Sequence, residues 1–93
     1  LPFLHRVSDG LLQGFIDRLV VWEEDGAVVG AEVVDFKTDV FDATDPGEVR
    51  AKVDFYRPQI DAYRKAVAGR YGLGLTTVTG RLLFLSVGLV EEL

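Results

Sequence analysis

Apolar runs separated by turn signals divide the first part of the chain into three extended segments. Residues 1–7 predict a short edge strand that ends at Ser8-Asp9-Gly10, and residues 11–22, rich in Leu, Val, Ile and Phe, predict a longer strand. The turn Glu24-Asp25-Gly26 leads into a third segment, residues 27–37. Because tight turns join strands that run in opposite directions, these segments predict an antiparallel meander.

The middle of the chain has the spacing of an amphipathic helix. Thr44 or Asp45 can cap its amino end, and Pro46 suits the first helical position. Pro58 interrupts the pattern, so the sequence predicts a first helical piece to about residue 55 and a second from about 57 to 71. The apolar and aromatic residues that recur at steps of three and four are Val49, Val53, Tyr56, Ile60, Tyr63, Val67 and Tyr71.

The last part of the chain predicts one more strand. Gly72 and Gly74 are expected to end the helix. Residues 77–87 alternate weakly between apolar and polar side chains, and the tail 89–93 can add a little more. A meander followed by a helix and a further strand indicates a mixed α+β fold of the α/β class, with one mixed sheet.

Length and composition indicate one small domain covering residues 1–93. The 93 residues are 48% hydrophobic and 27% charged, which allows a single thin core. The chain contains no Met at its first position or elsewhere, so we expect it to be a piece of a longer protein. No stretch approaches the roughly 18 apolar residues of a membrane span and no signal peptide is recognisable, which predicts a cytoplasmic protein without a membrane partner.

Cysteine content and net charge exclude several kinds of site. The chain has no cysteine, so this segment can hold no disulfide, thiolate zinc site or cysteine-ligated iron-sulfur cluster. Any metal must be held by oxygen atoms or by His5. The net charge of −5 has the wrong sign for binding nucleic acid through the overall field of the domain. Contacts with DNA would therefore be local, or carried by metal ions or by the parent protein.

Two charged residues, Asp35 and Lys37, lie at the end of a segment that otherwise predicts a buried strand. Charged groups in an apolar setting cost several kcal/mol unless they are paired or bind a metal. Side chains two positions apart on a strand share a face, so these two groups lie together. The ordinary interpretation is an exposed ion pair worth about 0 to 1 kcal/mol.

Asp17 in the preceding strand joins this pair in one of two hairpin registers. A three-residue loop Glu24-Asp25-Gly26 would set Asp17 opposite Val33, on the face of Asp35. A two-residue turn would set Asp17 opposite Val34, on the other face of the sheet. The sequence mildly favours the first register.

The first register would bring Asp17, Asp35 and Lys37 onto one patch of the sheet. Two carboxylates about 5 Å apart repel each other as bare anions, and a hard divalent cation such as Mg²⁺ relieves the repulsion. Such a cation polarises a phosphoryl oxygen and activates a bound water, while a nearby lysine orients that water. This combination of groups suits the hydrolysis of phosphodiesters.

Three stretches occur together and in order: LPFLHRVSDGLLQGFIDRL, VVDFKTD and YRPQIDAYRKAV. Together they resemble the RecB-like branch of the PD-(D/E)XK nucleases, as found at the carboxyl-terminal ends of helicase-nucleases of the AddA, RecB and UvrD-like kind. The resemblance covers about residues 2 to 70 and implies a restriction-endonuclease-like core that lacks its first helix here. It implies a metal-dependent exonuclease or endonuclease that cuts DNA during break repair and recombination, with a helicase motor as partner.

The resemblance also implies roles for individual residues. Gly14-Phe15-Ile16-Asp17 is similar to the strand with the first metal-binding acid, and Asp35-Phe36-Lys37 is similar to the acid-x-Lys core. On this match Asp17, Asp35 and the backbone carbonyl of Phe36 would bind Mg²⁺, for which Mn²⁺ would substitute. Lys37 would be the catalytic lysine.

A third part of the resemblance lies on the predicted helix. Gln59 and Tyr63 match a Gln-x-x-x-Tyr signature and share one helix face, so Gln59 can reach the catalytic site or DNA while Tyr63 packs or stacks. Arg57 is a further candidate for substrate binding through phosphate. The ordinary interpretation places Tyr63 in the core and Gln59 at a polar edge. His5 is too close to Asp17 in sequence to match the upstream metal-binding His of this branch and is not assigned that role.

Two other functions stay open on the sequence alone. A nuclease-like domain could bind DNA or a partner subunit without cutting, and the isolated segment could be weakly active or inactive. The third hypothesis is an unrelated α+β interaction domain, which would be supported if Asp17 and Asp35 lay on opposite faces of the sheet.

Overall fold

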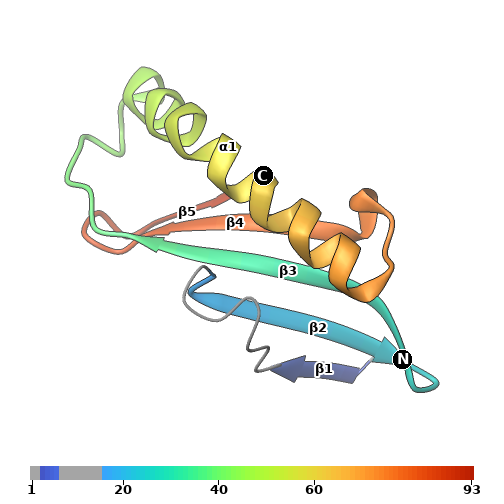
Figure 1. Cartoon of the computed structure of the whole chain (residues 1–93). Coiled ribbons are helices and arrows are strands. Elements are labelled where there is room, and N and C mark those ends of the chain that lie inside the picture. Colours follow the sequence, from blue (N-terminus) through green and yellow to red (C-terminus); the bar gives the residue numbers. More distant parts are fainter. Residues whose placement is uncertain (1–2, 7–15) are drawn as a thin grey trace.

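The computed structural model describes residues 3–6 and 16–93, which form a five-stranded sheet covered on one face by a long helix (Figure 1). The strands, in their order across the sheet, are β1 (Phe3–Arg6), β2 (Arg18–Glu24), β3 (Ala27–Lys37), β4 (Val78–Phe84) and β5 (Leu89–Glu92). Helix α1 (Pro46–Tyr71) and the short 3-10 helix η1 (Leu75–Thr77) connect β3 to β4. The mixed α+β class predicted from the sequence is confirmed.

The sheet is mixed because α1 carries the chain back across it. β1, β2 and β3 pair antiparallel, as the predicted meander requires. β4 then pairs with β3 in parallel, since the helical crossover returns the chain to the starting end of β3. β5 pairs antiparallel with β4 at the other edge. The helix lies over β3 and β4 (Figure 1).

The core lies between α1 and the middle of the sheet. Three of its helical members, Val53, Ile60 and Val67, are seven residues apart and therefore lie along one stripe of the helix. Ile60 and Val67 are fully buried, as is Val33 of β3 beneath them. The whole buried cluster comprises Leu19, Val21, Ala31, Val33, Val53, Ile60, Val67, Ala68, Val78, Leu82 and Phe84.

Helix α1 begins and ends as the sequence predicts but is not broken. The Asp45 side chain caps it by accepting from the Gly47 amide at 2.9 Å, Pro46 follows, and Gly72 ends it with a left-handed φ of 66°. The predicted break at Pro58 is wrong, because the helix continues through it to Tyr71. Pro58 costs one backbone hydrogen bond, and the burial of the apolar stripe offsets this loss. No helix in the described ranges is long and apolar enough to cross a membrane.

Two predicted strands have different bounds in the structure. β2 begins at Arg18, after Ile16 and Asp17 in irregular backbone, and residues 11–15 of the predicted strand lie outside the described residues. The last predicted strand, 77–87, is shorter because η1 precedes β4, which ends at Phe84. The tail forms β5.

Gly80 in β4 allows α1 to lie close to the sheet. A Cβ atom at this position would collide with Cγ2 of Ile60 and lie 3.4 Å from Cδ of Arg64. Only glycine therefore permits this approach, which also sets how deeply the helix side chains reach towards β3.

We expect Gly80→Ala to lower the free energy of unfolding by about 1–3 kcal/mol, as overpacking of a core does. The matched control is Gly69→Ala, because Gly69 is an exposed helical residue around which a Cβ would meet nothing within 4 Å. That change should instead raise the free energy of unfolding by about 0.5–1 kcal/mol. Urea unfolding measures both, and equal stabilities of the two variants would contradict the close approach.

Candidate functional site

The β2–β3 hairpin turns on two residues. Asp25 and Gly26 have positive φ angles of 52° and 79°, as in a type I′ turn, and Glu24 pairs with Ala27 across them. The three-residue loop favoured by the sequence analysis is therefore wrong. A regular ladder from this turn would set Asp17 opposite Val34, on the other face from Asp35.

A β-bulge then shifts the register by one more residue. Glu23 pairs with Val28 but Trp22 pairs with Gly30, so Val29 is the extra residue. The new register runs to the pair Arg18 and Val34. Its continuation sets Asp17 directly opposite Asp35, so the two acids share a face of the sheet. Neither of the two registers considered in the sequence analysis pairs these two residues, and both are therefore wrong in detail.

Asp17 and Asp35 form a pair of adjacent carboxyl groups. Asp17 is exposed, whereas Asp35 is only 5% exposed, and each carboxyl group shifts the pKa of the other. Burial and the adjacent Asp17 carboxyl raise the pKa of Asp35 above its usual value. The Asp35 carboxyl, together with a hydrogen bond from the Phe36 amide at 2.8 Å, lowers the pKa of Asp17.

Lys37 is held against this pair from the next position on the same face of β3. Its Nζ atom lies 2.8 Å from Oδ2 of Asp35 and donates to Oε1 of Gln59 at 3.0 Å. The same Nζ lies 4.2 Å from the centre of the Tyr56 ring, a cation–π contact worth about 0.5–2 kcal/mol. The lysine side chain is 18% exposed, so it borders solvent at the mouth of the site.

Oδ2 of Asp35 is a buried oxygen whose bonding is incomplete. Lys37 lies at ion-pair distance from it, yet no hydrogen bond of normal geometry reaches it from any described residue. Buried carboxylate oxygens without hydrogen bonds are costly, and functional sites are one kind of place where such atoms persist.

The Phe36 backbone faces Asp17. Its amide donates to Asp17, and the amide and carbonyl of one strand residue point to the same side, so the Phe36 carbonyl also points towards β2. The next residue, Lys37, uses its carbonyl on the opposite side, accepting from Leu85 at 2.9 Å. The Phe36 carbonyl as a metal ligand stays a prediction.

Gln59 and Tyr63 lie on one flank of α1. Gln59 reaches Lys37, as the sequence analysis predicted for a residue directed to the site. Tyr63 is half-buried and packs against the core cluster, which is the ordinary interpretation given for it above.

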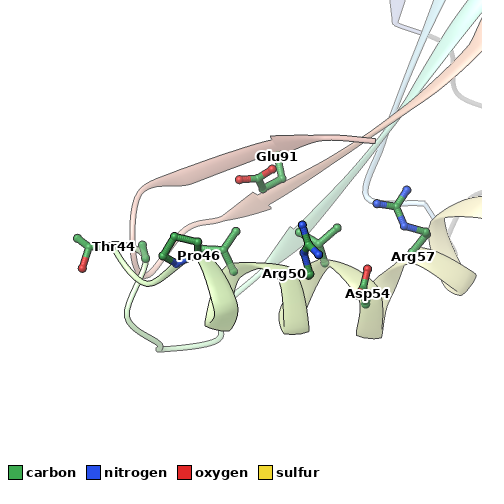
Figure 2. A pocket seen from close by; sticks show the side chains of 9 residues that line it. Thr44, Pro46, Arg50, Asp54, Arg57 and Glu91 are labelled. Carbon is green, nitrogen blue, oxygen red and sulfur yellow. The ribbon is translucent and has the colours of Figure 1, made fainter.

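Arg57 lies elsewhere. It is 200° away from Gln59 around the helix and lines a cleft of about 610 Å³ between α1 and β5. Arg50, Asp54 and Glu91 also line this cleft, and Figure 2 shows their side chains. The structure therefore does not bring Arg57 to Lys37, and its role in binding substrate stays a prediction.

The sequence analysis missed three residues around the lysine. Asp39 was not considered as a site residue and Tyr56 was named only among the residues at helical spacing, but the Tyr56 hydroxyl donates to both carboxylate oxygens of Asp39 at 2.8 Å. Lys52 donates to Asp39 at 2.9 Å. The available signal was spacing, because Lys52, Tyr56 and Gln59 follow one helix flank at steps of four and three.

Metal-binding groups near the site are few. Among the described residues no group of three or more His, Cys, Asp or Glu side chains is arranged to hold a metal ion. Asp17 and Asp35 are a pair, and a third ligand would have to come from a backbone carbonyl or solvent, both of which are usual for Mg²⁺. His5 pairs with Val21 in the sheet through its backbone.

Comparison of the chain with protein-family models, with curated proteins and with solved structures finds no match. Any functional assignment therefore rests on the site and on the sequence motifs. Chemically, the site offers two adjacent carboxylates, one ammonium group and one amide at the edge of a sheet. Such a group can bind a hard cation and present a positive charge to an anionic substrate.

We expect Asp35→Asn to stabilise the metal-free protein by about 1–2 kcal/mol at neutral pH. The amide can donate to Asp17 and accept from Lys37, so it mimics protonated Asp35 without a buried charge. Because the pKa of Asp35 is raised in the fold, the wild-type protein loses stability as the pH rises from the ordinary value of 3.8 through the raised one.

The stability that Asp35→Asn gains over the wild type should therefore be present at about pH 8 and small at about pH 4, as measured by urea unfolding at both values. Asp54→Asn, at an exposed position of α1, is the control. If Asp35→Asn is less stable than the wild type at the higher pH, the inference that a buried charge on Asp35 destabilises the fold is wrong.

Proposed function

We propose that this chain carries the active site of a magnesium-dependent deoxyribonuclease of the RecB-like PD-(D/E)XK type, built on a restriction-endonuclease-like core. The observation that carries the proposal is the convergence of Asp17, Asp35 and Lys37 on one face of the β2–β3 hairpin, with Asp35 buried. The three sequence stretches that resemble this branch contain these residues in the same order. An ordinary surface ion pair between Asp35 and Lys37 does not explain why a second acid lies beside the buried one.

The donor set fits a magnesium ion. Asp35 has a buried oxygen without a hydrogen bond, and Asp17 lies against it with its own carboxylate exposed to solvent. Asp17, Asp35 and the Phe36 carbonyl would hold the ion. When bound, Mg²⁺ would supply polarisation of the phosphate and a lowered pKa for a water molecule.

Lys37 and Gln59 would act on the substrate together. The ammonium group of Lys37 has three donors; one donates to Gln59, and the group lies at ion-pair distance from Asp35. A remaining donor can orient an attacking water or stabilise charge on the phosphate. Gln59 uses its oxygen on Lys37, which leaves its amide hydrogens for the DNA backbone.

The proposed substrate is DNA and the proposed partner is a helicase motor in the same polypeptide or complex, in the cytoplasm. Because the chain has a net charge of −5, it gains little attraction to DNA from its own field. A motor that delivers the strand would overcome this. Exonuclease or endonuclease action during break repair follows from the same resemblance.

Calorimetric titration with Mn²⁺ tests the metal site. Asp17→Ala and Asp35→Ala should each weaken binding at least about tenfold, or about 1.4 kcal/mol, because each removes one anionic ligand. Asp54→Ala, on the far flank of α1, is the matched control and should bind as wild type does. Binding that survives in both site variants would place the metal elsewhere.

Cleavage of linear DNA tests the reaction. With Mg²⁺ or Mn²⁺ the chain should cut DNA, a chelator should stop it, and Lys37→Ala should slow it by about 10²–10⁴-fold. Lys65→Ala changes an exposed helical lysine and should cut at the wild-type rate. A chain that binds metal and DNA without cutting would be a nuclease-like binding domain instead.

A further inference from the structure

Lys37 touches an aromatic ring in addition to its two polar partners. Asp35 and Gln59 contact its Nζ atom, and the Tyr56 ring lies 4.2 Å from the same atom. Tyr56 is on α1, three residues before Gln59, so the ring and the amide approach the lysine from the same flank of the helix. The ammonium group therefore lies between the acid on β3 and two side chains on α1.

The Tyr56 ring is itself fixed at its edges. It packs against Phe84 of the core, with ring centres 6.3 Å apart, and against Phe55 at 5.0 Å in an edge-to-face contact. Its hydroxyl donates to Asp39, two residues after Lys37. Lys52, one helical turn before Tyr56, donates to the same carboxylate at 2.9 Å. The ring is thus held by packing on one side and by an anchored hydroxyl on the other.

We propose that Tyr56 is a positioning residue for Lys37, and that Asp39 and Lys52 hold Tyr56 in place. A lysine side chain has four rotatable bonds, and its contacts with Asp35 and Gln59 alone leave it free to swing towards solvent. The face of an aromatic ring attracts a cation and blocks that space. The ring therefore narrows the positions open to Nζ before any substrate arrives.

The charge states around Tyr56 suit this arrangement at neutral pH. Hydrogen bonds from Lys52 and Tyr56 hold the pKa of Asp39 below its usual value. The hydrogen bond to Asp39 raises the pKa of Tyr56, so its hydroxyl keeps its proton and remains a donor. The hydroxyl is engaged with Asp39 and does not touch the reacting atoms, so Tyr56 acts through Lys37.

Nuclear magnetic resonance of the chain labelled with ¹³C-lysine tests the geometry without any activity. The sequence contains only Lys37, Lys52 and Lys65, so three Cε–Hε signals are expected, and Lys65→Arg and Lys52→Arg assign them. Protons above a ring face are shifted upfield. The Lys37 signal should lie upfield of that of Lys65, which is exposed on the helix.

Substitutions at Tyr56 distinguish the contribution of the ring to the Lys37 signal from that of the hydroxyl. Tyr56→Leu should abolish the upfield shift of Lys37, whereas Tyr56→Phe and Asp39→Ala should each reduce it by a similar amount. Because these two changes break the same hydrogen bond, the double variant should lose no more than either alone. Tyr63→Leu, a core tyrosine on the same helix, is the matched control and should leave the Lys37 shift intact.

A Lys37 signal that coincides with that of Lys65, or that keeps its shift in Tyr56→Leu, would overturn the positioning role. A full wild-type shift in Asp39→Ala would overturn the role of Asp39. If Tyr56→Leu fails to fold, which loss of dispersion throughout the spectrum would reveal, Tyr56→Phe and Asp39→Ala still decide the question.

The catalytic consequence rests on the proposed function and is tested separately. Tyr56→Leu should lower kcat for DNA cleavage about tenfold, or about 1.4 kcal/mol, with KM for DNA and Mn²⁺ affinity unchanged. If the wild-type chain does not cut DNA although the Lys37 shift is present, the nuclease proposal fails and the positioning stands. If it cuts and Tyr56→Leu cuts equally well, the role of Tyr56 in catalysis fails alone.

Discussion

The burial of Asp35 beside Asp17 is the constraint on which the site depends. A carboxyl group that is 5% exposed has lost most of its hydration, and of its two charged neighbours only Lys37 favours its ionised form, whereas Asp17 disfavours it. The core places Asp35 there, because the preceding inward residue of β3, Val33, is fully buried under α1. The same packing brings Gln59 within reach of Lys37. Fold stability and the unusual state of this carboxyl group therefore arise from one packed layer, and the site is expected to cost stability.

Much of the fold follows from local sequence signals. The structure has each of the features that local signals predict: the strand 27–37, the cap at Asp45, the proline after it and the terminating Gly72. Pro58 shows where local signals fail, because burial of the stripe around Ile60 outweighs one lost backbone hydrogen bond. The parallel pairing of β3 with β4 depends on the crossover of α1, and no short-range pattern specifies it.

The site was predictable in its residues and not in its geometry. Asp17, Asp35, Lys37 and Gln59 could be named from motifs, and the described structure brings these four side chains together. The register that joins the acids depends on a bulge that alternation of apolar and polar residues does not specify. The contact between Lys37 and Tyr56 depends on the rotation of the helix about its axis, and a periodic tyrosine looks the same in the sequence whether it faces the core or its edge.

The bulge at Val29 means that β3 has one residue more than β2 between the turn and the two acids. If Val29 were absent, the pairing would run without a shift from the two-residue turn to the two acids, because Glu23 pairs with Val28 and Trp22 with Gly30. The surplus residue is taken up at a position that is 41% exposed, far along the strand from the carboxyl groups. The extra residue is thus accommodated close to the turn, and without the bulge a hairpin of the same length would place the two acids on opposite faces of the sheet.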